Sequence, residues 1–291
     1  MYTGIESNGS PGFDDSKVSR MNSLLEEVPS FSNVVLKAQK LFNTPDYSTE
    51  ELADVLGSDP GLVAKILRIA NSSFYGMSRQ ISSLHDACII LGQKALRSLV
   101  MTAAVMDIAK SSRVDMERYK HHMTHFIHSA LIARDLARKI GLNGETAYLV
   151  GLLHDIGIIF IENIFTDELV HIREKAESNG GDCVKAEKSI LGFDHAEFSG
   201  KIASLWQLPD EIRLPVENHH KEDMIGLNLT GVIYLADKLS SQLKVAEQGS
   251  DPINLFDQKL LSKIGLTQDE IVEYMKDMMS LVEAGVSELM E

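Results

Sequence analysis

The stretch GLLHDIGIIF, residues 151–160, places a histidine and an aspartate next to each other between apolar side chains. A buried imidazole or carboxylate is costly unless it has a partner or binds a metal ion. Neighbouring residues of a helix point about 100° apart, so His154 and Asp155 can approach one metal ion or two from different directions. The stretch therefore indicates a metal site, or the scaffold of one, inside an apolar helix.

The composition is that of an ordinary globular protein with an acidic surface. Its 291 residues are enough for one large domain or two smaller ones, with 44% hydrophobic and 24% charged residues. The net charge of −14 makes nucleic acid an unfavourable partner, because phosphate backbones are repelled by such a surface.

Cysteine usage and targeting signals suggest a cytoplasmic location. Cys88 and Cys183 stand alone, so neither a disulfide framework nor a thiolate zinc site is expected. The N-terminal sequence lacks a basic-then-apolar signal pattern, and no apolar run approaches the roughly 20 residues that span a bilayer. We therefore expect no membrane association.

The apolar residues recur with helical spacing nearly throughout, and no segment alternates as a strand does. Ser48 and Glu51 form a capping box, Asp59-Pro60 is typical of a helix start, and Gly92 separates two helices. The predicted fold class is all-α, a multi-helix globular bundle. Further helices are predicted at about 118–140, 145–156, 166–178, 182–190, 195–206, 209–219, 226–246, 256–263 and 267–289.

Polarity divides the chain into four parts. Residues 1–20, rich in Gly, Ser and Asp, are expected to be a flexible tail. Residues 21–112 form an N-terminal helical part, and 113–250 contain the histidine-rich part with the candidate metal site. Residues 251–291 are a helical extension that either packs on the domain or serves a partner.

Several histidines and aspartates could join His154 and Asp155 in a metal site built from separate helices. Taken singly, any of these histidines fits a hydrogen-bonded structural role better than a ligand role. His121 and His125 share a helix face with His128 and could merely line a polar groove. Imidazole and carboxylate together suit Fe, Mn, Zn or Mg, and the candidate ligands are His128, His154, Asp155, His195, His219, His220 and Asp237.

The segment ELADVLGSDPGLVAKILRIA, residues 51–70, has spacing like that of a helix-turn-helix. Its second helix carries only Lys65 and Arg68 as positive charges, and Asp59 stands at the start, where a phosphate would approach. Close packing of two helices explains the pattern better than DNA binding does.

The ordered motifs resemble a known family. VGLLHDIG, preceded by FIHSALIARDLARKIG, is similar to the HD superfamily of metal-dependent phosphohydrolases. The segment that begins VPSFSNVVLKAQKLF and the later DHAEFSGKIASLWQLPDEIRLPVENHHKED and YLADKLS resemble the HDOD domain of bacterial signalling proteins. The resemblance covers about residues 24–245.

The resemblance implies roles for individual residues. His128 corresponds to the first histidine of the HD pattern, His154-Asp155 to the doublet, and Asp237 to the closing aspartate. His195 and His219 or His220 stand where the related HD-GYP cyclic-di-GMP phosphodiesterases supply further histidine ligands. One or two divalent metal ions would bind there, and Asp155, with a metal-activated water, is the candidate catalytic residue.

Two departures from HD-GYP enzymes favour regulation over catalysis. Those enzymes follow HDIG with a lysine, where this chain has Ile158, and their tandem histidine leads into a Gly-Tyr-Pro signature that is absent here. Loss of one positioned charge can cost roughly 3 kcal/mol of transition-state stabilisation. We therefore expect a regulatory module that binds a signalling protein and a nucleotide second messenger. The alternative is a metal-dependent phosphohydrolase acting on a nucleotide or cyclic-dinucleotide phosphodiester.

Overall fold

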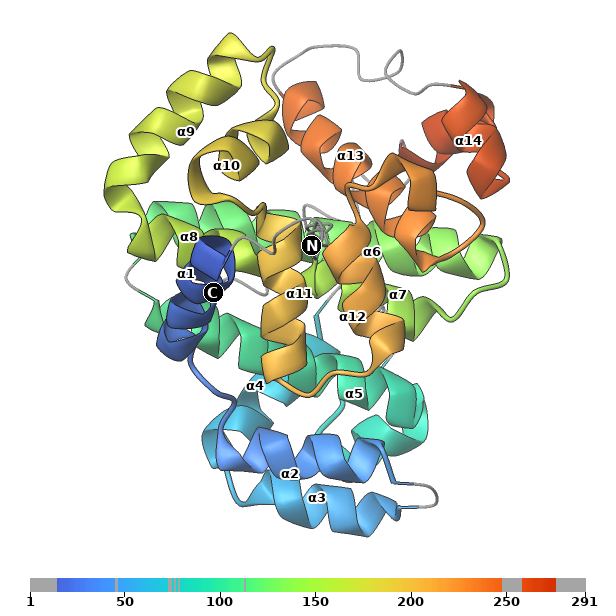
Figure 1. The fold of residues 1–291 in the computed structure, drawn as a ribbon. Helices are drawn as coiled ribbons and strands as arrows, with labels where there is room; N and C mark the ends of the chain where they lie inside the picture. The colour runs from blue at the N-terminus through green and yellow to red at the C-terminus, as the bar shows by residue number, and fades with distance from the viewer. Residues whose placement is uncertain are drawn as a thin grey trace, which may run out of the picture.

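Figure 1 shows the fold of the protein in a computed structural model. It describes residues 15–44, 47–72, 75, 77, 79–112, 114–247 and 258–275, and these contain helices and no strand. The helices, in chain order, are α1 (Asp15–Glu27), α2 (Asn33–Phe42), α3 (Thr49–Gly57), α4 (Pro60–Ala70), α5 (Leu84–Ser111), α6 (Met116–Lys139), α7 (Gly144–Leu153), α8 (Ile156–Ile164), α9 (Thr166–Ser178), α10 (Cys183–Leu191), α11 (His195–Leu205), α12 (Asp210–Asn218), the 3₁₀ turn η2 (Glu222–Met224), α13 (Leu229–Glu247) and α14 (Gln258–Ile264).

Local sequence signals set the helix ends as predicted. The Ser48 hydroxyl accepts a hydrogen bond from the Glu51 amide, and the Glu51 carboxylate accepts one from the Ser48 amide, both at 3.0 Å. Asp59 caps α4, whose first residue is proline. Gly92 interrupts α5 with a φ of 82° and a ψ of 164°, a conformation that a residue with a side chain rarely adopts.

The predicted helices from residue 118 onward match α6, α7 and α9 to α13 within three residues at most ends. The prediction for 145–156 is wrong at its C-terminal end, because the helix stops at Leu153 and a second helix begins at Ile156. This break isolates His154 and Asp155 at a junction, and α8 is an element that the sequence analysis did not predict.

Glycines allow the helices around this junction to approach closely. A Cβ on Gly151 would lie 2.6 Å from the Cα of Ala130 on α6, and a Cβ on Gly157 would lie 2.7 Å from the carbonyl oxygen of His195. The Gly157 amide also donates a hydrogen bond to the Ser199 hydroxyl on α11, at 2.9 Å. The two glycines that flank the His-Asp pair thus place it directly against α6 and α11.

The N-terminal prediction needs a correction. Residues 15–20, assigned to a flexible tail, form the first turns of α1, while residues 1–14 lie outside the described residues. Arg20 binds the Glu168 carboxylate at 2.8 Å and lies over the Phe165 ring at 4.5 Å. Contacts with α9, far along the chain, therefore support this helix, and composition alone could not reveal them.

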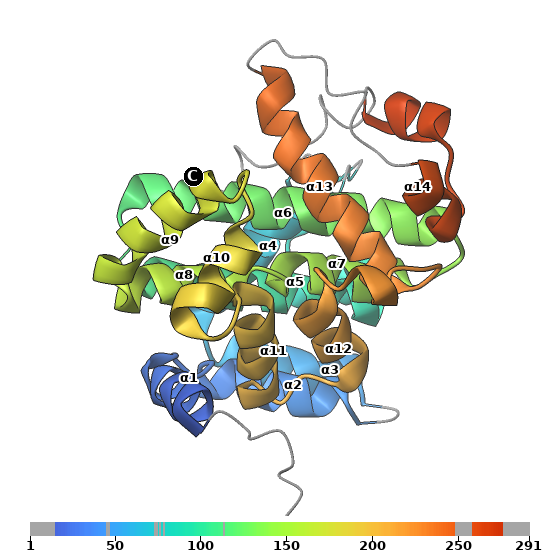
Figure 2. The same ribbon diagram turned by 45° about the horizontal axis from the view of Figure 1, so that its top comes forward.

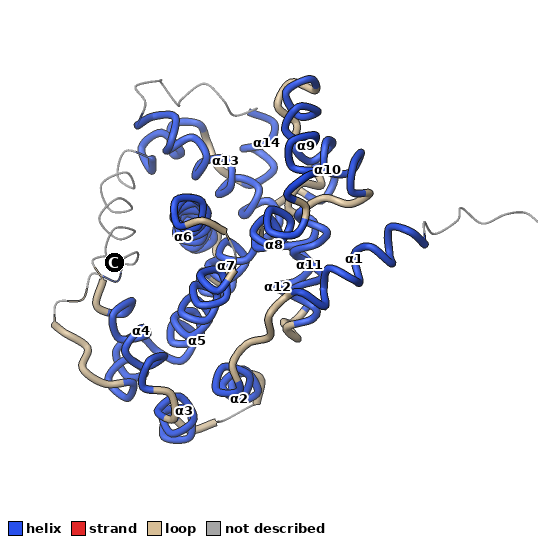
Figure 3. Tube along the Cα trace, turned by 90° about the vertical axis from the view of Figure 1, so that its left-hand side faces the viewer, coloured by secondary structure: helices blue, strands red, loops and turns tan. Residues whose placement is uncertain are grey.

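One apolar core runs through the molecule from Met21 to Met275. Helices α5, α7 and α6 lie side by side, and α13 crosses α6 (Figures 2 and 3). The Trp206 indole donates a hydrogen bond to the Pro29 carbonyl at 3.1 Å and packs against the Phe31 ring, with centroids 4.4 Å apart. The parts 21–112 and 113–250 are therefore packed together through a shared core.

The C-terminal extension packs on the domain within residues 258–275. Leu261, Ile264 and Ile271 are buried in the common core, and the Lys139 ammonium of α6 lies 5.1 Å from the Tyr274 ring centroid. The predicted helices 256–263 and 267–289 are present as α14 and as a helical segment at 268–275, and the remainder lies outside the described residues.

Two segments, Leu84–Ser111 and Gly144–Ile164, are apolar and long enough to cross a membrane. In their most apolar stretches 61% and 78% of the residues are buried inside the protein, as expected of core helices. The two segments therefore give only weak evidence for membrane insertion.

Candidate metal centre

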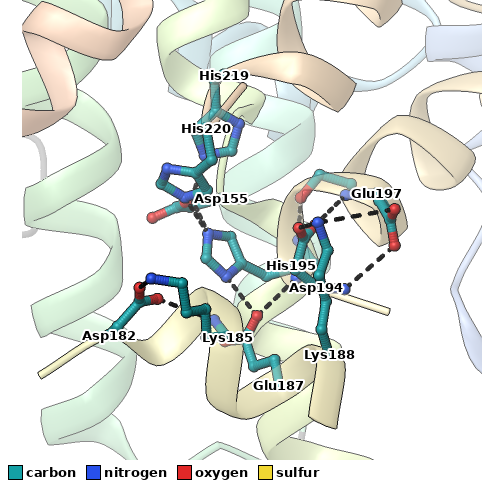
Figure 4. A network of polar contacts seen from close by, with 12 residues as sticks. Asp155, Asp182, Lys185, Glu187, Lys188, Asp194, His195, Glu197, His219 and His220 are labelled. Carbon is teal, nitrogen blue, oxygen red and sulfur yellow. Dashed lines mark hydrogen bonds and ion pairs between the residues drawn. The ribbon is translucent and has the colours of Figure 1, made fainter. Parts of the chain in front are cut away.

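Five parts of the chain bring histidine and aspartate side chains to one place. His154 and Asp155 come from the α7–α8 junction, His195 from the first residue of α11, and His219 and His220 from the end of α12. The other two contributors are His125 on α6 and Asp237 on α13. Figure 4 shows Asp155, His195, His219 and His220 pointing toward one another.

These seven residues form two groups that share Asp155. One group contains Asp155 with three histidines, and the other contains Asp155 with two histidines and Asp237. Within each group, one potential ligand atom of every residue lies within 4.8 Å of the others, a spacing that could hold a metal ion. The first group consists of Asp155, His195, His219 and His220. The second group consists of His125, His154, Asp155 and Asp237.

The two oxygens of Asp155 serve the two groups separately. Its Oδ1 lies 3.3 Å from Nε2 of both His195 and His219. Its Oδ2 lies 3.3 Å from Nε2 of His154 and 3.4 Å from Nε2 of His125. One carboxylate thus stands between two sets of imidazoles and would be the ligand common to both if each set held a metal ion.

Asp237 faces the second group from α13. Its Oδ1 lies 3.3 Å from Nε2 of His125 and 3.9 Å from Nε2 of His154. This group therefore combines two imidazoles with two carboxylates, a nitrogen and oxygen donor set that suits Fe, Mn or Zn.

Hydrogen bonds orient the imidazole rings. The Nδ1 atoms of His154 and His219 lie 2.7 Å from the carbonyl oxygens of Gly151 and Val216. A carbonyl only accepts, so each Nδ1 must carry the proton, which leaves Nε2 free to bind a metal when the ring is neutral. The Ser240 hydroxyl on α13 donates to the His125 carbonyl at 3.3 Å and lies 3.0 Å from Nδ1 of the same residue, which also orients this ring.

Glu187 holds His195 and was missed by the sequence analysis. Its Oε2 accepts hydrogen bonds from both the backbone amide of His195, at 2.8 Å, and its Nδ1, at 2.7 Å. Glu187 is buried, whereas Lys185 and Lys188 on the same helix, α10, are exposed (Figure 4). Carboxylate–histidine pairs of this kind support metal ligands in many sites. No local signal marks Glu187, because its role depends on how α10 folds back onto α11.

Three potential ligand atoms are buried without a hydrogen bond. They are Nε2 of His154, Nε2 of His219 and Oδ1 of Asp155. Leaving such atoms unsatisfied costs about 1–3 kcal/mol each, and all three point into the centre. A divalent cation in each group would satisfy them, with His219 and Asp155 Oδ1 in one group and His154 in the other. The residues present therefore fit an HD-type metal.

Neighbouring charges strongly shift the pKa values of His154, His195 and Asp155. Burial alone would lower the pKa of His154, but the carboxylates of Asp155 and Asp237 outweigh it and raise the pKa to about 10. Burial likewise opposes the charge of His195, whose pKa is raised to about 9 by Glu187 and Asp155. Burial would raise the pKa of Asp155, yet the surrounding imidazoles hold it well below its usual range.

His220 behaves differently from its neighbours. Its Nε2 lies 2.7 Å from Nε2 of His195. Burial and the neighbouring His219 and His195 lower its pKa to about 2, so it is neutral at pH 7. Without a metal, a charged His195 donates to both Glu187 and His220.

The structure places His125, and not His128, in the centre. Three residues correspond to about 300° around a helix, so the two side chains leave α6 about 60° apart. Packing of α6 against α13 turns His125 toward Asp237, while His128 is buried outside both groups. The other six candidate ligands, His154, Asp155, His195, His219, His220 and Asp237, are brought together as the sequence analysis expected.

Two glutamates flank the tandem histidine in the sequence. Glu217 binds the Arg213 guanidinium at 2.7 Å, and Glu222 is exposed on η2. His122 contacts Glu162 at 2.9 Å and belongs to neither group.

Comparison with curated proteins finds distant relatives. An uncharacterised protein of Treponema pallidum (strain Nichols) is 24% identical over 199 residues, which cover 67% of this chain and 38% of that protein. A ribonuclease Y of Mycoplasma genitalium (strain ATCC 33530 / DSM 19775 / NCTC 10195 / G37) is 26% identical over 159 residues, covering 54% of this chain and 27% of that protein. The chain therefore spans well under half the length of these relatives.

Solved structures share the fold over nearly the whole chain. A proposed phosphohydrolase from Shewanella amazonensis SB2B has a TM-score of 0.76 and 22% identity, covering 93% of this chain and 98% of that one. An HDOD domain protein of unknown function from Geobacter sulfurreducens has a TM-score of 0.75 and 24% identity, with 94% and 98% coverage. A proposed signal transduction protein from Marinobacter aquaeolei VT8 has a TM-score of 0.72 and 22% identity, with 98% and 68% coverage.

The likeness to these structures, at such identities, shows the fold alone. The family model for the HDOD domain matches residues 28–222, more than half of the chain. That match includes the α7–α8 junction and both histidines at the end of α12, and the fold and the site agree with it. The chain belongs to the HDOD domain family.

Proposed function

We propose that the protein is a regulatory HDOD protein of signal transduction whose HD-type centre binds two divalent metal ions. The observation that carries the proposal is the sharing of Asp155 between two four-residue groups. Each oxygen faces its own set of imidazoles at 3.3–3.4 Å, which supports one ion in each group. Fe, Mn, Zn and Mg are the candidates, and the mixed imidazole and carboxylate donors favour the first three.

Two features support regulation over catalysis. Six of the seven side chains are buried and His220 is partly exposed, which leaves little room for a substrate phosphate. Among the residues that the structure describes, none of the seven forms an ion pair with a lysine or arginine, and position 158 carries isoleucine. A phosphoryl group would thus reach the centre without a positioned protein cation to stabilise developing charge.

A metal-dependent phosphohydrolase is the second candidate. It is favoured because each of the two groups offers four potential metal ligands. Two metal ions about 3.5–4 Å apart activate water and stabilise phosphoryl oxygens in many hydrolases. Asp155, as the shared ligand, would position both ions. The distant likeness to a ribonuclease Y and to a proposed phosphohydrolase is consistent with a nucleotide or cyclic-dinucleotide phosphodiester as substrate.

Metal content and hydrolysis, measured together, test both candidates. Untagged protein purified without chelators should contain about two ions per chain by inductively coupled plasma mass spectrometry. Asp155→Asn should lose both, and the exposed Asp223→Asn should keep them. A metal-free wild-type chain that remains folded would contradict the metal proposal.

The loaded protein is then incubated with bis(p-nitrophenyl) phosphate and with cyclic dinucleotides, in Mn²⁺ and in Fe²⁺. The regulatory proposal expects no hydrolysis above that of Asp155→Asn. Turnover that depends on the metal and disappears in Asp155→Asn would instead support the phosphohydrolase.

A regulatory role implies a signalling protein as partner and a nucleotide second messenger as ligand, with the protein acting in the cytoplasm. The net charge of −14 argues against nucleic acid.

A further inference from the structure

A cavity of about 440 Å³ lies between α4, α5 and the first turns of α6, and it contains no residue of the metal centre. Its size is within the range of pockets that bind small molecules, about 300–1,000 Å³. Helices α4 and α5 pack against each other along one side of the molecule (Figure 3). The cavity is thus a separate site in the N-terminal part of the HDOD domain.

The rim of this cavity is positively charged. Lys65 and Arg68 come from α4, and Lys110 comes from α5. Lys65 is paired with Asp107, whereas Arg68 and Lys110 form no ion pair or hydrogen bond with another residue that the structure describes. Two uncompensated cations on one cavity, in a chain of net charge −14, mark a site for an anion.

The floor of the cavity is apolar. Ile69, Met106 and Tyr119 are buried there, and Met116 is 54% exposed at the edge. Methionine side chains adapt to irregular partners and make favourable contacts with aromatic rings. A purely inorganic anion would leave this apolar surface uncovered, so the floor calls for a ligand with a flat apolar part.

We propose that this cavity binds a nucleotide, with the base against the exposed Met116 over the apolar floor and the phosphate at Arg68 and Lys110. The proposal gives a role to Arg68 of the helix-turn-helix-like segment, while Lys65, the other cation of that segment, is paired with Asp107. DNA would instead require a broad basic surface. The proposal does not depend on the metal centre.

Calorimetric titration of the full chain with AMP, ADP, GMP and GDP tests this proposal, with and without bound metal. At least one of the four should bind saturably, with a dissociation constant below about 1 mM. Replacing the exposed pair Arg68→Gln and Lys110→Gln should weaken binding roughly tenfold or more, because charge-assisted hydrogen bonds to phosphate are lost.

The matched control is Lys37→Gln with Lys40→Gln, which removes the same charge from exposed positions on α2 and should leave binding within about twofold. Ala64→Trp, at an exposed cavity position, should block binding while circular dichroism shows an unchanged fold. Absence of binding by all four nucleotides would overturn the proposal. So would equal weakening by the control pair, or equally tight binding of inorganic phosphate or of a short DNA oligonucleotide.

Discussion

At the scale of single residues, Asp155 and Glu187 contribute most to the proposed function. Asp155 faces both metal-ligand groups, and Glu187 fixes one ligand of one group through two hydrogen bonds. The two residues therefore make different predictions, since loss of Asp155 affects both groups and loss of Glu187 affects only the group that contains His195.

Glu187→Gln should selectively weaken the group of Asp155, His195, His219 and His220. The amide retains the size of the carboxylate but not its charge, and loss of such a supporting partner typically lowers metal affinity about 10–100-fold. Competition with a chromogenic chelator should show one weakened ion and one unchanged ion. Glu174→Gln, on the exposed surface of α9, is the charge-matched control. If Glu187→Gln binds both ions as tightly as the wild-type protein does, the contact only stabilises the fold.

Metal uptake should release protons. The pKa values of about 10 for His154 and about 9 for His195 lie above neutral pH, although burial opposes both charges. Both rings are therefore protonated in the metal-free chain at pH 7.5, and a metal must displace roughly two protons. Affinity should consequently fall as the pH is lowered. Titration calorimetry in two buffers of different ionisation enthalpy gives the number released, and a value of zero would contradict the charge assignment.

At the scale of elements, the junction between α7 and α8 positions the His-Asp pair. The helix break turns His154 and Asp155 inward, and Gly151 and Gly157 let α7 and α8 lie directly on α6 and α11. Because each glycine faces backbone atoms of another helix, neither contact can relax by moving a side chain.

Gly157→Ala tests this close packing. Its Cβ would lie 2.7 Å from the carbonyl oxygen of His195, so α8 and α11 must separate. We expect a loss of about 1–3 kcal/mol in the free energy of unfolding and weaker metal binding through His195. Gly57→Ala, whose Cβ would meet nothing within 4 Å, is the control and should change stability little. Urea denaturation measures both variants, and unchanged stability of Gly157→Ala would refute the close packing.

At the scale of the whole molecule, the N-terminal helices and the metal-binding part share one core. Trp206 connects them, since its indole lies against Phe31 and binds the Pro29 carbonyl. Polarity along the sequence predicts a division at residues 112–113, but continuous packing across this division predicts one cooperative unfolding unit.

Trp206→Ala should destabilise both parts together. Truncation of a fully buried tryptophan typically costs about 3–5 kcal/mol. Hydrogen exchange followed by mass spectrometry should show faster exchange in α2 and in α11 alike. Leu205→Ala, at the exposed neighbouring position, should have little effect. Faster exchange limited to one part would show that the two parts unfold independently.

The sequence by itself determined the helical fold and most of its element boundaries. Ser48, Asp59-Pro60 and Gly92 act on backbone groups within one helical turn, so their effects can be predicted from the residues alone. The His-Asp pair and the histidines near residues 195 and 220 were also recognisable, because their motifs keep a fixed order along the chain.

Only the tertiary structure decided which side chains meet. His125 enters the centre in place of His128 because α13, more than 100 residues later, contacts α6 through Ser240. Glu187 reaches His195 through the turn between α10 and α11, and Arg20 connects α1 to α9 by binding Glu168. Such contacts depend on the rotation and position of helices that are distant in sequence. Helical periodicity specifies which face is apolar, but it leaves this rotation undetermined.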